Sequence, residues 1–245
     1  MELHPLTERP MLARNALTLC CTLLLAACSG GGSGGLTEAP VIPADPIITV
    51  AEDGNTQITA DTLNTQLEAL PLGTLSDAET AGLLLMREEE KLARDVYRAL
   101  FDVHGTPIFN NIADSEQTHT DAVKALLDRY SLVDPVGEDV PGTFENAELQ
   151  SLYTFLVGLG QATVLDALYV GAQVEELDIR DIESLKAEVV DNDDIILVYD
   201  NLLRGSRNHL RAFHRQIEAA GGVYLPQYLT DEAYNAIVTT GIERG

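Results

Sequence analysis

Apolar residues recur three and four positions apart along a stretch that begins near residue 77. Such spacing places them on one face of a helix. Ser76 and Glu79 have the spacing of a capping box at its start, and Gly105 and Pro107 are typical of a helix end. The pattern predicts a long helix over residues 77–104. Its expected buried face carries Leu83, Leu85, Met86, Leu92, Ala93, Val96, Tyr97 and Leu100.

Similar patterns predict five more helices further along the chain. Gly158 and Gly160 are expected to break the short helix that starts at residue 146, and Gly221-Gly222 to end the long helix that starts at residue 193. Before residue 71, the run 47–50 is compatible with a short strand and 62–70 with a short helix. The five expected ranges are about 110–130, 146–159, 163–190 and 193–220, followed by a short amphipathic helix from about residue 230.

The lengths of the connections indicate how the four long helices are arranged. The first and second are joined by a short link, as are the third and fourth, whereas a long connection separates the second from the third. This order is typical of the ferritin-like four-helix bundle, in which one long crossover joins helices two and three. We therefore expect an all-α fold of that type, with an interrupted α-solenoid as the alternative.

The second long helix carries two residue types that bind metal ions. Glu116 and His119 stand three positions apart, so their side chains lie on one face one turn apart. A carboxylate and an imidazole directed into a bundle interior are costly unless something pairs with them, and a metal ion can do so. The alternative is a helix surface that happens to carry both residues.

The other long helices offer matching ligands. In ferritin-like di-metal proteins, two helices each supply one glutamate and the other two each supply a Glu-x-x-His pair. Here the first helix offers Glu90, or Glu89, and the third offers Glu175, with Glu176 at the edge of the same face. The fourth helix offers His209, although a serine stands where its paired glutamate would be. Hard oxygen and imidazole ligands favour iron or manganese, with zinc as a further option.

Charge and cysteine content narrow the functional classes. The chain has 15 Lys and Arg against 39 Asp and Glu, a formal charge of −24. Nucleic acids and anionic membrane surfaces attract basic proteins, so a nucleic-acid partner is not expected. The three cysteines all lie within the first 28 residues, which excludes disulfides, thiolate zinc sites and iron–sulfur clusters from the rest of the chain.

The N-terminus has the layout of an export signal. Two arginines precede an apolar run over 17–27, which is too short to span a membrane. The run ends in Leu-Ala-Ala followed by Cys28, which resembles the bacterial lipobox. We expect a lipoprotein signal peptide over 1–27, with lipidation at Cys28 that anchors the protein to the bacterial cell envelope. An ordinary signal peptide cut elsewhere is the alternative.

The remaining chain then divides in two. Residues 28–71 form a Gly/Ser/Pro-rich tether and an irregular segment, because a Gly/Ser run over 29–35 is followed by prolines up to 46. Residues 72–245 are expected to form the helical bundle domain.

Several motifs also carry a family resemblance. The run from Glu90 to Tyr97 resembles the first helix of rubrerythrin-type proteins, in which the ligand glutamate precedes an alanine by three positions and a tyrosine by seven. Residues 83–217 as a whole resemble an uncharacterised prokaryotic family of ferritin-like domains. The motifs that carry this resemblance are MREEEKLARDVY from Met86, SEQTH from Ser115, EELDI from Glu175 and SRNHLRAF from Ser206.

The resemblance implies a ligand set for a di-iron or di-manganese centre. By position, Glu90 and His119 would hold one ion and Glu175 and His209 the other, with Glu116 bridging them. Ser206 departs from the pattern, because a bridging carboxylate is expected there. The second ion therefore has fewer ligands, unless Asp178 reaches the site as a replacement.

Two functions fit this set of expectations. The first is an oxidoreductase that acts on peroxide, oxygen or ferrous iron, for which the absence of a cysteine-based redox module implies an external electron donor. The alternative is a non-catalytic lipoprotein, either metal-binding or purely structural.

The lipobox generates a prediction about location. Cys28→Ala should release the protein from the membrane fraction, because an acyl anchor contributes about 0.8 kcal/mol per buried methylene and the variant has none. Fractionation of cells followed by immunodetection measures this. Membrane association equal to that of the wild type would contradict the lipoprotein assignment.

Overall fold

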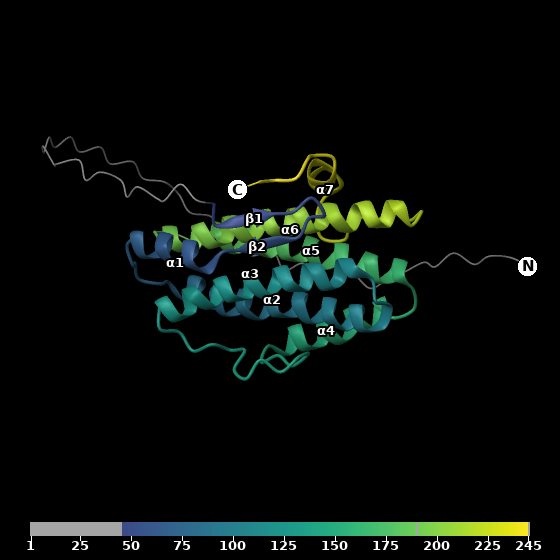
Figure 1. Cartoon of the computed structure of the whole chain (residues 1–245). Coiled ribbons are helices and arrows are strands. Elements are labelled where there is room, and N and C mark those ends of the chain that lie inside the picture. The colour runs from purple at the N-terminus through teal and green to yellow at the C-terminus, as the bar shows by residue number, and fades with distance from the viewer. Residues whose placement is uncertain (1–45, 190, 245) are drawn as a thin grey trace, which may run out of the picture. The chain divides into compact units, whose positions relative to one another are not determined.

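The computed structural model describes residues 46–189 and 191–244 (Figure 1). This part of the chain is mostly helical, which confirms the expected all-α class, and its only strands form one small hairpin. The predicted signal peptide, Cys28 and the Gly/Ser run lie outside the described residues. Within them, no helix is both long and apolar enough to cross a bilayer.

The first two long helices form an antiparallel pair. Helix α2 spans Asp77–His104 and begins with the predicted capping box, in which Ser76 accepts from the Glu79 amide and Glu79 accepts in return. Gly105 ends it at φ 63°, a conformation that a glycine adopts without strain. Helix α3 spans Pro107–Arg129, so it begins three residues earlier than expected. The proline occupies the first helical turn, where its missing N–H costs nothing.

The later helices also follow the predicted order. Asn146 caps α4, and this helix includes Gly158 in its interior and ends only after Gly160. The expectation that Gly158 breaks it is therefore wrong, because a glycine within a helix weakens it without necessarily ending it. The bounds are Ala147–Gly160 for α4, Val164–Ala187 for α5, Asp193–Ala219 for α6 and Asp231–Val238 for α7.

The four long helices share one core. Helix α2 packs against α3, α5 against α6, α2 against α5, and α3 against α6. Helix α4 packs on α2 and α5, whereas α7 contacts α6. The core between them is lined by Leu, Ile, Val and Phe side chains, and many of these are fully buried.

A short hairpin lies across α3 and α6 (Figure 1). Strand β1, Ile48–Val50, pairs antiparallel with β2, Thr56–Ile58, and helix α1 follows over Ala60–Ala69. Ile47 and Ile48 are buried in the same core as the long helices. The described part of the expected irregular segment is therefore packed on the helical domain, and the core begins well before residue 72.

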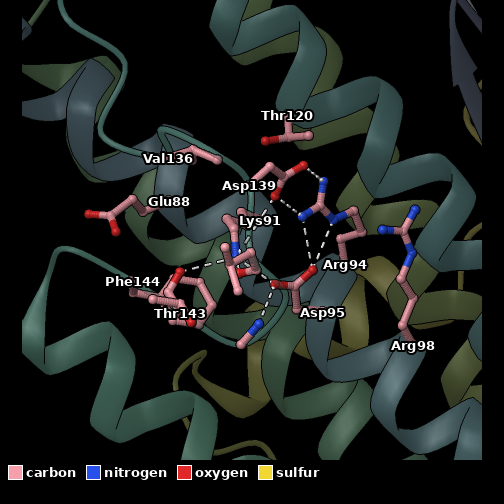
Figure 2. Close-up of polar contacts among 12 residues, drawn as sticks. Glu88, Lys91, Arg94, Asp95, Arg98, Thr120, Val136, Asp139, Thr143 and Phe144 are labelled. Atoms are coloured by element: carbon pink, nitrogen blue, oxygen red, sulfur yellow. Dashed lines mark hydrogen bonds and ion pairs between the residues drawn. The ribbon is translucent and has the colours of Figure 1, made fainter.

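Buried charged side chains of α2 form ion pairs and hydrogen bonds with the long connection between α3 and α4 (Figure 2). Arg94 donates to both Asp95 and Asp139, and Lys91 donates to Asp95 at 2.6 Å. The Lys91 amine also donates to the backbone carbonyls of Val140 and Thr143. These bonds hold the connection against a polar face of α2.

Glu88 belongs to the same face. It is 4% exposed, and its carboxylate accepts from the backbone amides of Glu145 and Asn146 just before α4 begins. The connection between α3 and α4 therefore covers this carboxylate.

The buried network generates a stability prediction. Asp95→Ala should lower the free energy of unfolding by about 3 kcal/mol or more, because it leaves the buried Lys91 amine without its carboxylate. Urea denaturation followed by circular dichroism measures this loss. Asp128→Ala is the matched control, because Asp128 pairs with Lys124 at the same spacing but with both side chains exposed. That control should change stability by less than about 1 kcal/mol, and equal losses would refute the prediction.

Candidate metal centre

Five ionisable side chains from four helices meet in the interior. Glu90 comes from α2, Glu116 and His119 from α3, Glu175 from α5 and His209 from α6. Each is at most 2% exposed. These are the five residues that the sequence analysis selected, and the fold brings all of them together.

Glu116 lies between the two histidines. Its Oε2 atom is 2.7 Å from Nδ1 of His119, and its Oε1 atom is 2.9 Å from Nδ1 of His209. The two imidazole rings are stacked with centroids 5.3 Å apart. Glu116, His119 and His209 thus offer ligand atoms within 4.8 Å of one another, which is close enough for one metal ion to contact all three.

A second carboxylate lies beyond each histidine. Oε2 of Glu90 is 3.4 Å from Nδ1 of His119, and Oε2 of Glu175 is 3.5 Å from Nδ1 of His209. Each histidine therefore faces one oxygen of the shared Glu116 and one oxygen of its own outer glutamate. The sequence analysis expected fewer ligands around His209, but the two halves of the cluster are closely matched.

Several atoms of the cluster make no hydrogen bond of good geometry, although all but Oε1 of Glu90 lie in the ion-pair contacts described above. Five of the eight buried side-chain N and O atoms without a hydrogen-bond partner, among the described residues, belong to this cluster. A buried polar group left unpaired costs about 1–3 kcal/mol, so such a concentration needs a physical reason. A cation shared by all of these atoms would supply one. The five atoms are both carboxylate oxygens of Glu90, Oε2 of Glu116, and Nδ1 of His119 and of His209.

Without a cation, the cluster is held together by protons. Burial would lower the pKa of His119, but Glu116 and Glu90 raise it to about 10. Burial likewise opposes protonation of His209, but Glu116 and Glu175 raise its pKa to about 9. Burial raises the pKa of Glu90 and of Glu175 to about 7. Burial also acts to raise the pKa of Glu116, but the two imidazoles outweigh it and hold that pKa well below its usual value. A bound cation would replace these protons.

The sequence alone did not decide between Glu89 and Glu90, or between Glu175 and Glu176, and the structure shows which member of each pair faces the histidines. Glu89 is buried beside Asp181 and away from the histidines, and its pKa is raised by burial and by that aspartate. Glu176 accepts from the backbone amides of Gln227 and Tyr228, both at 2.7 Å. Glu89 thus faces Asp181, and Oε2 of Glu176 faces the backbone at residues 227–228, although the second oxygen of Glu176 makes no hydrogen bond. Glu90 and Glu175 instead face the two histidines.

Asp178 and Ser206 form a further polar pair beside the cluster. Ser206 donates a short hydrogen bond to Oδ2 of Asp178, and both side chains are buried. Burial raises the pKa of Asp178 well above its ordinary value, and the charges of Glu90, Glu116 and Glu175 raise it further. This aspartate is thus near the three glutamates, at the position where the sequence lacks the expected carboxylate.

Tyr97 orients one of the outer carboxylates. Its hydroxyl donates to Oε1 of Glu175 at 2.5 Å, and the ring is fully buried between Phe109 and Phe213. Burial and the Glu175 charge raise the pKa of the phenol well above its usual value, so it remains a proton donor. The bond leaves Oε2 of Glu175 directed toward His209.

Thr56, which the sequence analysis did not select, also contacts the cluster. Its Oγ1 atom lies 3.1 Å from Nε2 of His119 and 2.9 Å from Nε2 of His209. The threonine is on strand β2, and its side chain is fully buried. No local motif marks it, because its partners lie 63 and 153 residues further along the chain.

Gly205 on α6 leaves the space that the His119 ring occupies. A Cβ atom at this position would lie 2.6 Å from Nε2 of His119 and in still closer contact with Cε1. Real Cβ atoms essentially never approach so closely, so the ring or the helix would have to move. The absence of a side chain at residue 205 therefore sets how near α6 comes to α3 at the cluster.

This close approach generates a second stability prediction. Gly205→Ala should lower the free energy of unfolding of the metal-free protein by about 1–3 kcal/mol through overpacking against His119. Gly158→Ala is the control, because it too lies inside a helix but has open space around it. That variant should gain about 0.5–1 kcal/mol from helix propensity. Thermal or urea unfolding compares the two, and a gain at both positions would contradict the packing argument.

Comparison with known proteins places these residues in a family. A profile described as an uncharacterized protein domain, DUF2202, matches residues 79–241. The uncharacterized protein MJ0754 of Methanocaldococcus jannaschii is 49% identical over 179 residues, which cover 73% of this chain and 96% of the relative. The crystal structure of that hypothetical protein matches with a TM-score of 0.69, covering 71% of this chain and 99% of that one. The profile match includes all five cluster residues but not Thr56, and the chain belongs to this family of uncharacterized DUF2202 domains.

Proposed function

We propose that this protein binds a divalent transition metal, iron or manganese, through Glu116, His119 and His209, with Glu90 and Glu175 as outer ligands. The observation that carries the proposal is the concentration, at one buried point, of carboxylate oxygens and imidazole nitrogens that make no hydrogen bond. Carboxylate oxygens and imidazole nitrogens, with no thiolate, form a donor set that suits these two metals.

The symmetry of the cluster favours two ions. Each histidine faces Glu116 and one outer glutamate at closely similar distances, so the arrangement offers two equivalent sets of ligands around a shared carboxylate. The three glutamates and Asp178 carry four negative charges when all are deprotonated. Those charges balance two divalent cations held otherwise by neutral imidazoles, and Asp178 thus takes the electrostatic place of the carboxylate that Ser206 lacks.

The arrangement of the helices supports a ferritin-like fold. The helices α2, α3, α5 and α6 contact one another in the order that a four-helix bundle requires, and the residues between α3 and α5 would be its long crossover. In such bundles the metal site is built from inward-facing side chains of all four helices. The five cluster residues come from these same four helices.

The function that this centre supports best is redox chemistry on a small substrate. Iron or manganese in such a site supplies one-electron exchange with peroxide, dioxygen or ferrous iron. The protein's own contribution is to exclude water and to hold the carboxylates, because every ligand is at most 2% exposed. The enclosure restricts substrates to small molecules or ions. Reduction of peroxide or dioxygen would take its electrons from ferrous iron or from another external donor, because cysteines that could form a redox module occur only in the first 28 residues. We propose that the protein acts at the cell envelope, attached through Cys28.

The same enclosure favours a second candidate function. A site sealed on all sides can hold a metal for storage or for structural stability without any substrate access. In that case the protein is a non-catalytic metal-binding lipoprotein. Turnover of peroxide or ferrous iron by the metal-loaded protein distinguishes the two candidates.

The proposed centre generates a prediction about metal affinity. Glu175→Gln should weaken Mn²⁺ binding by at least about tenfold, because it removes a charged ligand while keeping the side chain's shape. Isothermal titration calorimetry of the metal-free protein with Mn²⁺ measures the affinity and the number of ions bound. His119→Ala and His209→Ala should each lose affinity to a similar extent, since their surroundings are matched.

Glu176→Gln is the control for this experiment. Glu176 is adjacent in sequence and equally buried, but its carboxylate caps the backbone at residues 227–229. Its substitution should leave the Mn²⁺ affinity within about twofold of the wild type, because the residue lies outside the ligand set. If the wild type binds no Mn²⁺, or if both glutamine variants bind as tightly as the wild type, the metal proposal is wrong.

A further inference from the structure

We infer that Thr56 is a positioning residue, whose single hydroxyl fixes the orientation and the tautomer of both histidines. The inference rests on the proposed metal-binding function and deepens it. The residue lies outside the family match over residues 79–241 and on a strand rather than on any of the four helices.

The hydrogen-bonding capacity of the hydroxyl carries the argument. Thr56 Oγ1 lies within hydrogen-bond distance of Nε2 of His119 and of His209. A hydroxyl has one proton but two acceptor lone pairs. It can therefore accept from both imidazoles at once, but it can donate to only one of them.

Two accepted bonds give the tautomer that a metal requires. When Nε2 of each ring carries the proton and donates it to Thr56, Nδ1 of each ring keeps its lone pair. Those Nδ1 atoms are the ones that face Glu116. Metal-bound histidines commonly donate their other ring N–H to an oxygen that fixes the ring in this way. Here one oxygen serves two rings.

Two hydrogen bonds join the hairpin to α3 next to Glu116 and His119. The Thr56 amide donates to Oγ of Ser115 at 2.9 Å, and the Ile58 amide donates to Oγ1 of Thr118 at 3.1 Å. Ser115 directly precedes Glu116 in the sequence, and Thr118 directly precedes His119. The helix turn that presents the ligands therefore also holds the strand that orients them.

The contact lies in a closely packed part of the core. Thr56 is fully buried, and a Cβ atom at Gly205 would lie at ordinary contact distance from its Oγ1 but would overlap the His119 ring. The absence of a side chain at Gly205 thus accommodates the ring that donates to Thr56. Removal of the hydroxyl alone would leave two buried N–H groups facing a methyl group.

Two substitutions separate the hydroxyl from the shape of the side chain. Thr56→Val keeps the shape and removes the hydroxyl, whereas Thr56→Ser keeps the hydroxyl and removes the methyl group. We expect the valine variant to bind Mn²⁺ about 10- to 100-fold more weakly than the wild type. The serine variant should retain affinity within about fivefold, because the two accepted hydrogen bonds remain possible.

The experiment uses the full chain in detergent, titrated with Mn²⁺, and a second sample loaded with Zn²⁺ for nitrogen-15 NMR of the histidine rings. The wild type should show Nδ1 bound to zinc and a protonated, slowly exchanging Nε2 in both rings. In the valine variant these Nε2 protons should exchange faster or be lost, an effect that a purely structural role would not produce. Circular dichroism establishes that each variant is folded, and Thr56→Ala replaces the valine variant if that one is not.

The outcomes separate this inference from the function on which it rests. A wild type that binds neither Mn²⁺ nor Zn²⁺ overturns the proposed function and this inference together. A wild type that binds both, with a valine variant that binds equally well, overturns the inference alone. Equal losses in the valine and serine variants also overturn it, because they would assign the effect to packing rather than to the hydroxyl.

Discussion

The Glu116 carboxylate between two imidazoles is the interaction on which the interior of this protein depends. A glutamate that is 2% exposed can remain charged only if positive charge surrounds it, and both histidines supply that charge or share it with a cation. The outer carboxylates Glu90 and Glu175 then face the same two rings. The contacts of these five residues thus join α2, α3, α5 and α6 at one point of the interior.

Helix α2 shows how one segment serves two sets of partners. Glu90 and Tyr97 face the interior, where Glu90 contacts His119 of the candidate metal centre and Tyr97 donates to Glu175. Lys91, Arg94 and Asp95 lie between them in sequence but face the connection that leads to α4 (Figure 2). The high polarity of this run thus results from two buried polar surfaces on opposite sides of one helix, with little of it exposed to water.

Most of the helices and the five residues of the cluster could be predicted because they depend on local signals. Helical periodicity and the Ser76 cap defined α2, and the three-residue spacing of Glu116 and His119 predicted a shared face. Periodicity could not choose between Glu175 and Glu176, because adjacent residues both border a buried face and the tail after α6 covers one of them. Thr56 could not be found at all, since its role arises from a strand that is distant in sequence.

The complete enclosure of the cluster has a consequence for kinetics. No ligand atom can meet a dissolved ion while the helices and hairpin are closed, because each ligand residue is at most 2% exposed. Entry and exit of a metal then require a local opening, whose free energy sets the exchange rate. For the proposed centre, residence time is governed by the protein's own motions rather than by the strength of the coordinate bonds. An ion held at the proposed centre would therefore exchange only as often as the protein opens locally.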